Sequence, residues 1–357
     1  MLSAIKAKFD KAKDILANVA TGTGTELSYV VEHRDWIIRR IGQDVTGYLN
    51  RQKLLKSRIT TAHQGLNGGI VHFGSINTFI RKENPVKTHK LSKIVLTWFH
   101  IRDNDEVFVD SLVQEPQRVA KIHTACRATK DFLVSRGFPQ EKISVIPLGV
   151  NLNVFSKAHD RAAFRQLHGI PKDALVIGSF QKDGVGWTKG SQAKMIKGPD
   201  IFAEVVAKLK DKYPVFVLLV GPARGWLEAK LKDAGVPYKS IGYLKNADHV
   251  SRYYHLLDIY LITSRLEGGP QQILEAWASG VPVVATRVGM IPDIAVDEKD
   301  TLLADSEDVK GLFDRCARLA ENPQLRLELA EGAAEKVKEF SWDKIAERYY
   351  QEIYRSI

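Results

Sequence analysis

The chain has 357 residues, of which 44% are hydrophobic and 26% are charged, and its formal net charge is +10. This length is long for one compact core and fits two globular domains. The longest apolar runs, such as Val215–Val220, are far shorter than the ~20 residues needed to cross a bilayer. Charged residues interrupt the start of the chain, so no secretory signal is predicted there. The two distant cysteines, Cys126 and Cys316, predict neither a disulfide framework nor a zinc motif, which favours a reducing, cytoplasmic compartment.

The positive charge is unevenly distributed along the chain. Residues 1–155 contain 23 Lys/Arg and 14 Asp/Glu, whereas the remaining residues contain 29 and 28. A basic first half favours an anionic partner such as a membrane surface, although it equally serves solubility. Residues 1–20 are expected to form an amphipathic helix, which would lie on an anionic membrane or cap the first domain. Its apolar positions are Leu2, Ile5, Phe9, Ala12, Leu16 and Val19.

Short apolar strands alternate with segments of helical length through most of the chain. In the first half, the expected strands are Leu27–Glu32, Gly69–Gly74, Ile94–His100, Lys121–Thr124 and Ile143–Pro147, and the expected helices include Trp36–Leu55 and Arg127–Arg136. In the second half, the expected strands are Leu175–Phe180, Val215–Gly221, Lys239–Gly242, Asp258–Ser264 and Val281–Thr286, and the expected helices are Asp200–Asp211, Gly225–Ala234, Asp248–Leu257 and Gln271–Ser279. This pattern predicts two α/β units with parallel sheets, joined near residue 155.

The densest signal is the segment DIYLITSRLEGGPQQILEAWASGVPVVATRVGMIP at Asp258–Pro292. An apolar strand ending at Ser264 leads into a tight loop, and Pro270 stands where a helix would begin. Gly268 and Gly269 would let a ligand approach the backbone closely. Free N–H groups at a helix start attract phosphate oxygens, and open α/β sheets bind ligands beyond the carboxyl ends of their strands. The loop therefore suits a diphosphate sugar.

Within this segment, Glu267 and Glu275 fall in the pattern EGG loop, EA helix and GVPVVAT strand, with Gly289 in register. The pattern resembles the signature of the retaining glycosyltransferases of family four, which adopt the GT-B fold. The resemblance implies two Rossmann-like α/β domains facing each other across a cleft. Residues 1–155 would form an acceptor-binding domain, to which a terminal helix at 341–357 returns, and residues 156–340 would bind the nucleotide-sugar donor.

Other stretches support the resemblance. Lys130–Phe155 is similar to the end of the first domain in that family, with Asn151 where Asp is usual. The segments IGSF at 177–180 and KGPD at 197–200 resemble the pair that grips the donor diphosphate. Ser179 replaces the usual Arg, and Lys182 is a candidate source of the missing charge, with a solvated surface lysine as the alternative.

The resemblance assigns roles to residues of this chain. Glu275 would bind ribose, Lys197 would hold the diphosphate, and Glu267 would orient the donor sugar. His100, at a strand end, would contact the sugar or diphosphate, unless it is simply a hydrogen-bonded core histidine. The remaining donor-binding candidates are Ser179, Lys182, Tyr243, Gly268, Gly269, Pro270 and Gln271.

The resemblance implies a retaining hexosyltransferase that uses a UDP- or GDP-sugar, and we expect no metal ion or other cofactor. Its acceptor would be a glycan or a lipid-phosphate-linked sugar in surface polysaccharide synthesis, reached at the inner face of the membrane. Alternatives are a GT-B epimerase or phosphorylase, or an inactive nucleotide-sugar-binding homologue in view of Ser179. An oxidoreductase is disfavoured because the G-x-G-x-x-G turn is missing, and a nucleic-acid-binding protein because no recognisable module is present.

Overall fold

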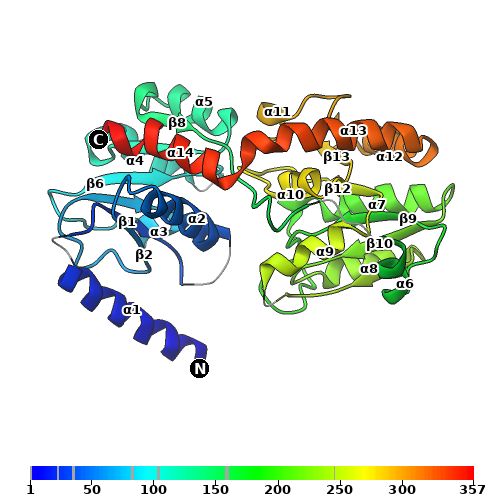
Figure 1. The fold of residues 1–357 in the computed structure, drawn as a ribbon, viewed down its shortest axis with the longest axis horizontal. Coiled ribbons are helices and arrows are strands. Elements are labelled where there is room, and N and C mark those ends of the chain that lie inside the picture. Colours follow the sequence, from blue (N-terminus) through cyan, green and yellow to red (C-terminus); the bar gives the residue numbers. More distant parts are fainter. Residues whose placement is uncertain are drawn as a thin grey trace. The chain divides into compact units, whose positions relative to one another are not determined.

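The computed structural model describes residues 2–21, 24–33, 37–81, 84–102, 105–156, 161–244 and 246–357. The chain forms two compact units, unit 1 (Met1–Gly149 and Trp342–Ile357) and unit 2 (Val150–Ser341). Each unit contains one six-stranded sheet with helices packed against it (Figure 1). All strand pairs in the two large sheets are parallel, which confirms the α/β class predicted from the alternation of strands and helices. Among the described residues, no helix is both long and apolar enough to cross a membrane.

The sheet of unit 1 has the strand order β2-β1-β3-β6-β7-β8. Its strands are β1 (Leu27–Val30), β2 (Ser57–Thr60), β3 (Ile70–Phe73), β6 (Lys93–Thr97), β7 (Lys121–Thr124) and β8 (Ile143–Val145). A short antiparallel pair, β4 (Ile80–Arg81) and β5 (Asn84–Pro85), lies outside this sheet. Since β2 follows β1 on one side and β3 lies on the other, the direction of winding reverses between β1 and β3. Such a reversal is where open α/β sheets bind ligands.

The helices of unit 1 include the two ends of the chain. They are α1 (Leu2–Thr21), α2 (Ile37–Arg51), α3 (Ile76–Phe79), α4 (Glu106–Gln114), α5 (Arg127–Ser135) and α14 (Trp342–Glu352), with single 3₁₀ turns at Pro116–Arg118, Gln140–Lys142 and Tyr354–Ser356. Helix α2 buries Ile38, Ile41, Val45 and Leu49, whose spacing of three and four residues places them on one face. Helix α14 packs against α2, where the Tyr48 hydroxyl donates a 2.5 Å hydrogen bond to Glu347. Residue 36, the expected start of α2, lies outside the described residues.

Helix α1 packs on unit 1 through polar side chains. The amide of Asn18, which is fully buried, donates to the carbonyl oxygens of Ala62 and Gln64 at 2.8 Å each. The apolar stripe predicted from the sequence faces outward instead, because Leu16 is 71% exposed and Phe9 is 61% exposed. The side chains of residues 2–6, which would continue the stripe, lie outside the described part. Helix α1 therefore both caps unit 1 and exposes an apolar face.

A buried polar network fastens the C-terminal segment to the sheet of unit 1. His72 Nδ1 lies 2.6 Å from the hydroxyl of Tyr354, and His72 Nε2 lies 2.8 Å from Thr97 Oγ1. The Tyr349 hydroxyl lies 3.1 Å from His123 Nδ1. Burial lowers the pKa of both histidines, that of His123 to about 4, so both rings are neutral near pH 7. Their role in the structure is to join β3 and β7 to the last residues of the chain.

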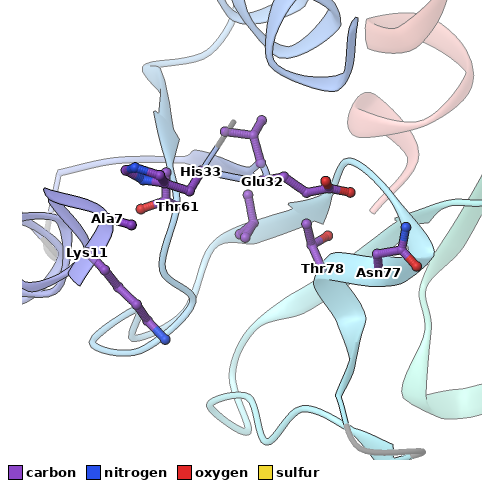
Figure 2. Close-up of a pocket in the computed structure, with 9 residues that line it drawn as sticks. Ala7, Lys11, Glu32, His33, Thr61, Asn77 and Thr78 are labelled. Atoms are coloured by element: carbon purple, nitrogen blue, oxygen red, sulfur yellow. The ribbon is translucent and has the colours of Figure 1, made fainter. Parts of the chain in front are cut away.

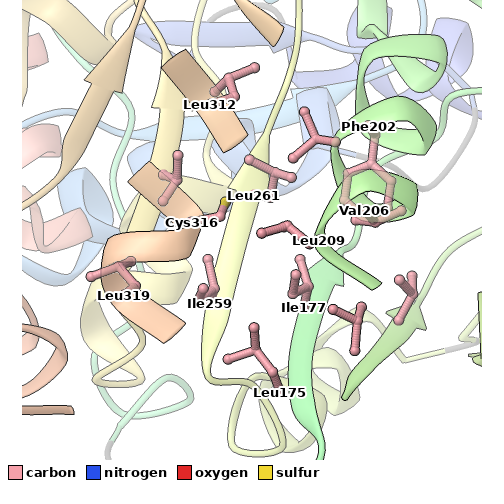
Figure 3. Close-up of a cluster of buried hydrophobic side chains, with 14 of the residues drawn as sticks. Leu175, Ile177, Phe202, Val206, Leu209, Ile259, Leu261, Leu312, Cys316 and Leu319 are labelled. Carbon is pink, nitrogen blue, oxygen red and sulfur yellow. The ribbon is translucent and has the colours of Figure 1, made fainter. Parts of the chain in front are cut away.

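The sheet of unit 2 has the strand order β11-β10-β9-β12-β13-β14. Its strands are β9 (Leu175–Ser179), β10 (Val215–Leu219), β11 (Tyr238–Ser240), β12 (Ile259–Ile262), β13 (Val283–Thr286) and β14 (Leu302–Ala304). The central strands are buried along their whole length and are mostly apolar, as expected for a parallel sheet that is covered on both faces. Figure 3 shows Ile177 and Ile259 of the sheet packing with Phe202, Val206 and Leu312 of the covering helices.

The helices of unit 2 follow the strands in turn. They are α6 (Arg161–Leu167), α7 (Pro199–Lys210), α8 (Gly225–Asp233), α9 (Ser251–Tyr254), α10 (Gln272–Ala278), α11 (Ile291–Ile294), α12 (Val309–Glu321) and α13 (Pro323–Lys336), with 3₁₀ turns at Met195–Lys197, Ala247–Val250 and Val337–Phe340. The expected helix at 248–257 is a 3₁₀ turn followed by the short α9. Helix α10 begins at Gln272 rather than at Pro270, whose carbonyl oxygen accepts a hydrogen bond from Ile273 N at 3.2 Å.

Candidate functional site

The carboxyl ends of β9 and β12 meet at the reversal point of the unit 2 sheet. Strand β10 follows β9 on one side, and β12 lies on the other side of β9. The chain leaves β9 at Ser179 and leaves β12 at Ile262, so the loops that follow both strands emerge at the same edge. This is the place where ligands of open α/β sheets bind. Most of the site residues predicted from the sequence lie on these two loops.

Gly198 brings the start of α7 against the end of β12. Its backbone has φ of +61°, and a Cβ at this position would lie 1.9 Å from the carbonyl oxygen of Thr263. The Thr263 hydroxyl donates a 2.7 Å hydrogen bond to the carbonyl oxygen of Gly198. Only glycine tolerates both the left-handed conformation and this approach. The contact places the neighbouring residue, Lys197, beside the loop that follows β12.

Lys197 and Glu267 form an ion pair at this edge. The Lys197 ammonium donates to Oε1 of Glu267, and the Ser264 hydroxyl donates to the same oxygen at 2.9 Å. The Lys197 side chain is 18% exposed and that of Glu267 is 8% exposed, so the pair is largely shielded yet still reached by solvent. Two residues assigned from separate motifs are thus brought into direct contact.

Gln181 links the two loops around this pair. Its side-chain amide donates to the carbonyl oxygen of Lys197 at 3.0 Å, and its Oε1 accepts from the Ser264 hydroxyl at 3.3 Å. The side chain is buried, being 7% exposed. Sequence reasoning did not assign Gln181, although its position directly after the buried strand β9 was a usable signal.

The Gly268–Gln271 loop is held by the segment after β13. Met290 N donates to the carbonyl oxygen of Gly268 at 2.9 Å. A Cβ on Gly289, whose φ is +54°, would lie 2.6 Å from that same oxygen. Gly268 and Pro270 are buried, whereas Gly269 and Gln271 are partly exposed. The closeness of this contact explains why a glycine is needed at 289 beside the two glycines of the loop.

Glu275 lies on α10 with its carboxylate oriented by a buried tyrosine. The hydroxyl of Tyr254, which is fully buried, donates to Oε2 of Glu275 at 2.8 Å. Burial, followed by the nearby negative charge of Glu275, raises the pKa of Tyr254 well above its usual value. The tyrosine is therefore a neutral donor at every physiological pH, and Glu275 is held in one orientation.

Ser179 lies beside an arginine that sequence reasoning missed. The guanidinium of Arg224, which is buried, donates to Ser179 Oγ at 3.1 Å and also to the carbonyl oxygen of Gln181. Its counter-ion is Asp183, which is also buried, at 3.1 Å. Burial lowers the pKa of Arg224 and raises that of Asp183, while their mutual attraction opposes both shifts. A positive charge therefore lies beside Ser179, but it belongs to Arg224 of the loop after β10 and not to the residue at position 179.

Lys182, Tyr243 and His100, the remaining predicted residues, each have surroundings of their own. The ammonium of Lys182 lies 4.9 Å from the ring centroid of Trp187, a cation–π arrangement within the 181–196 insert. Tyr243 lies on the loop after β11 and is 59% exposed. His100 belongs to unit 1, follows β6 and is partly exposed. Within the described ranges, no group of three or more His, Cys, Asp or Glu side chains is arranged to hold a metal ion.

Part of this site lies in a segment that matches a family model. Residues 185–322 match the model of the family glycosyl transferases group 1. The matched segment includes Lys197, Arg224, Glu267 and Glu275. The chain is also similar to proteins named D-inositol 3-phosphate glycosyltransferase, with 29% identity over 240 residues in Corynebacterium urealyticum and 31% over 229 residues in Corynebacterium jeikeium. These alignments cover 63% and 59% of this chain, and the chain spans about half, 54% and 52%, of these relatives.

Solved structures show that the fold is shared over the whole chain. The Anabaena protein Alr3699/HepE, solved with UDP-glucose, superposes with a TM-score of 0.74 at 16% identity, covering 93% of this chain and 100% of that one. A sucrose-phosphate synthase from Thermosynechococcus elongatus superposes with a TM-score of 0.65 at 17% identity, covering 90% and 79%. The fold predicted from the sequence, GT-B with two α/β domains, is confirmed.

Proposed function

We propose that this protein is a glycosyltransferase that moves a sugar from a nucleoside-diphosphate donor to a hydroxyl of an acceptor. The observation that carries the proposal is the contact between Lys197 and Glu267 at the reversal point of the unit 2 sheet. A cation and a carboxylate at one strand edge match the two ends of a sugar diphosphate, because phosphate oxygens need positive charge and sugar hydroxyls need acceptors.

Each residue has a task in this proposal. Lys197 neutralises the negative charge that develops on the departing diphosphate, and Glu267 accepts hydrogen bonds from hydroxyls of the transferred sugar. Glu275, oriented by Tyr254, accepts from the ribose hydroxyls. When the diphosphate binds, the Lys197 ammonium donates hydrogen bonds to the phosphate oxygens, either in place of its bond to Glu267 or in addition to it. We expect no metal ion to be required, so that EDTA leaves the rate unchanged.

The proposed reaction exchanges one bond for another at the anomeric carbon. The bond between that carbon and the diphosphate oxygen breaks, and the bond to the acceptor oxygen forms. The acceptor hydroxyl loses its proton to the departing diphosphate. If both groups use the same face of the sugar, the anomeric configuration is retained, as the resemblance of the EGG…EA segment to family four implies.

The donor and acceptor are proposed from chemistry and from relatives. A UDP-sugar is supported by the UDP-glucose complex of Alr3699/HepE, and a GDP-sugar is the second choice. The acceptor would be a glycan or a lipid-phosphate-linked sugar in surface polysaccharide synthesis. The exposed apolar side chains of α1, among them Leu16 at 71% exposure, together with the excess lysines of the first half, support contact with an anionic membrane.

The test is turnover of UDP-glucose, UDP-N-acetylglucosamine and GDP-mannose with glycan and lipid-phosphate-linked acceptors. We expect acceptor-dependent release of one nucleoside diphosphate and an NMR spectrum of the product that shows the donor's anomeric configuration. Glu267→Gln should lower kcat by at least 100-fold, a typical loss of transition-state stabilisation, while Glu328→Gln, an exposed glutamate on α13, should not. Conversion of the donor without an acceptor would indicate an epimerase. Nucleotide binding without any turnover would indicate an inactive homologue, for which Ser179 is the supporting observation.

A further inference from the structure

Unit 1 contains a cavity at the reversal point of its own sheet. The cavity has a volume of about 290 Å³ and lies where β1 and β3 end, between their following loops and helix α1. Its lining residues are Ala7, Lys11, Val30, Val31, Glu32, His33, Thr61, Asn77 and Thr78. In Figure 2, Ala7, Lys11, His33 and Thr61 lie on one side and Asn77 and Thr78 on the other. This position is the one at which open α/β sheets bind ligands.

Helix α1 is fastened across this region by hydrogen bonds. The carboxylate of Asp14 accepts from the backbone N–H and the hydroxyl of Thr61, at 2.7 and 2.6 Å. Asn18 Oδ1 accepts from Arg58 at 2.6 Å, and Asp10 lies 3.8 Å from His33 Nε2. The polar side of α1 thus faces the cavity wall at Thr61 and His33. The apolar stripe of the helix therefore faces outward.

The polar groups of the cavity are oriented before any ligand arrives. Glu32 Oε1 accepts from the hydroxyl of Ser75, which is buried, at 3.1 Å. Thr78, also buried, is fixed by a 2.7 Å bond to the carbonyl oxygen of Ser75. The carboxylate and the start of α3 are therefore held in one arrangement, as a specific small-molecule site requires.

The lining identifies the chemistry of the ligand. It mixes a carboxylate, an amide, hydroxyls, an imidazole and one ammonium with the apolar side chains of Val30 and Val31. These groups donate to and accept from alcohols, while the valines suit the C–H faces of a ring. A lining with one lysine and one glutamate disfavours a diphosphate or another polyanion, because Glu32 would repel it. The volume is at the lower end of the roughly 300–1,000 Å³ of small-molecule pockets, which suits a single ring.

We propose that the cavity between α1 and the carboxyl ends of β1 and β3 binds an uncharged polyhydroxylated ring, a sugar or a cyclitol. Its identification as the acceptor of the transfer reaction rests on the proposed function. The ring is either a free molecule or the head group of a lipid, and the two sources present the same hydroxyls to Glu32 and Asn77.

The test is saturation-transfer NMR on the full chain with methyl α-glucoside, methyl α-galactoside and myo-inositol, and with vesicles containing phosphatidylinositol. We expect at least one probe to bind. Ala7→Trp, which fills the cavity, and Glu32→Gln should each weaken that binding at least fivefold. Ala12→Trp places the same side chain on the exposed side of the same helix and should leave the binding of the free rings unchanged. Binding to vesicles that is weakened in Ala7→Trp, without binding of any free ring, would identify a lipid head group as the source.

The inference is overturned if no probe binds the wild-type protein, or if binding survives Ala7→Trp. It is also overturned if Ala12→Trp abolishes binding as well, because the effect would then not come from the cavity. UDP binding is measured on the same samples. Binding of UDP without binding of any ring probe would contradict this inference and leave the proposed function intact. Ring binding without binding of any nucleotide would sink the proposed function and leave a polyol site without an acceptor role.

Discussion

The hydroxyl of Tyr254 donates a 2.8 Å hydrogen bond to Oε2 of Glu275, joining the end of α9 to α10. A hydrogen bond to a charged group contributes about 1.5–3 kcal/mol. If Glu275 binds ribose, Tyr254→Phe should weaken nucleotide binding by roughly tenfold, which corresponds to ~1.4 kcal/mol, and should leave kcat at saturating donor nearly unchanged. Tyr253→Phe, at the neighbouring and partly exposed tyrosine, is the matched control. Equal affinities for the two variants would show that Tyr254 does not orient a ligand-binding carboxylate.

A second prediction concerns the close approach at Gly198. Gly198→Ala places a Cβ 1.9 Å from the carbonyl oxygen of Thr263 and also strains a φ of +61°. Gly186→Ala, at a φ of +81°, meets nothing within 4 Å and so reports the strain alone. We expect about 1–2 kcal/mol of destabilisation at Gly186 and clearly more at Gly198, measured as the free energy of unfolding in urea. Equal losses would mean that α7 moves freely away from β12.

The buried pair of Arg224 and Asp183 gives a third prediction. Arg224→Met leaves the Asp183 carboxylate without its counter-ion, so we expect about 3–5 kcal/mol of destabilisation. The double variant Arg224→Met/Asp183→Leu should recover much of this loss, because no charge remains buried. Lys310→Met, in a pair on α12 whose lysine is 85% exposed, should leave stability nearly unchanged. A double variant less stable than Arg224→Met would contradict the account.

The two buried histidines of unit 1 predict how stability depends on pH. Burial lowers the folded-state pKa of His123 from the usual 6.5 to about 4, and burial, followed by the neighbouring His123, lowers the pKa of His72 well below its usual value. Both are neutral above pH 6.5 in the folded and unfolded states, so their contribution is fully present there. As the pH falls from 6.5 towards 4, only the unfolded state takes up protons, and stability falls. The loss from His123 should reach about 3 kcal/mol near pH 4.

Urea unfolding between pH 4 and pH 7.5 measures this slope. The double variant His72→Gln/His123→Gln should show a flatter slope between pH 4.5 and 6.5, whatever its absolute stability. Carboxylates contribute their own slope mainly below this window, since their usual pKa values are near 4. An unchanged slope in the double variant would show that the histidines do not titrate on unfolding.

The alternation of strands and helices was predictable because burial on both faces makes parallel strands apolar. Strand β7 was predicted with its correct bounds, and β9 and β10 to within two residues. Two edge strands were missed. Strand β2 has the sequence SRIT with two partly exposed positions, and β14 has only three residues. The partly exposed positions of β2 weaken its apolar signal, whereas β14 is buried but too short to show a strand period.

A contact in the candidate site was predictable from the sequence only where both contacting residues belong to recognisable motifs. The contact between Lys197 and Glu267 joins two segments of the same motif set. Arg224 was missed because its contact with Ser179 depends on the register of β9 and β10, which no local pattern encodes. The cavity under α1 was missed for the same reason, since its lining comes from four separated segments and from the way α1 packs. The outward apolar face of α1 likewise follows from the hydrogen bonds of Asp14 and Asn18.

The central claim is that a nucleoside diphosphate binds beside Lys197, and calorimetric titration of the full chain with UDP and GDP tests it most directly. We predict micromolar binding of one of them, weakened at least tenfold in Lys197→Met. The matched variant Lys208→Met, at a lysine that is 52% exposed on α7, should bind as tightly as the wild type. Absence of binding by both nucleotides, or equal affinity in Lys197→Met and Lys208→Met, would contradict the account.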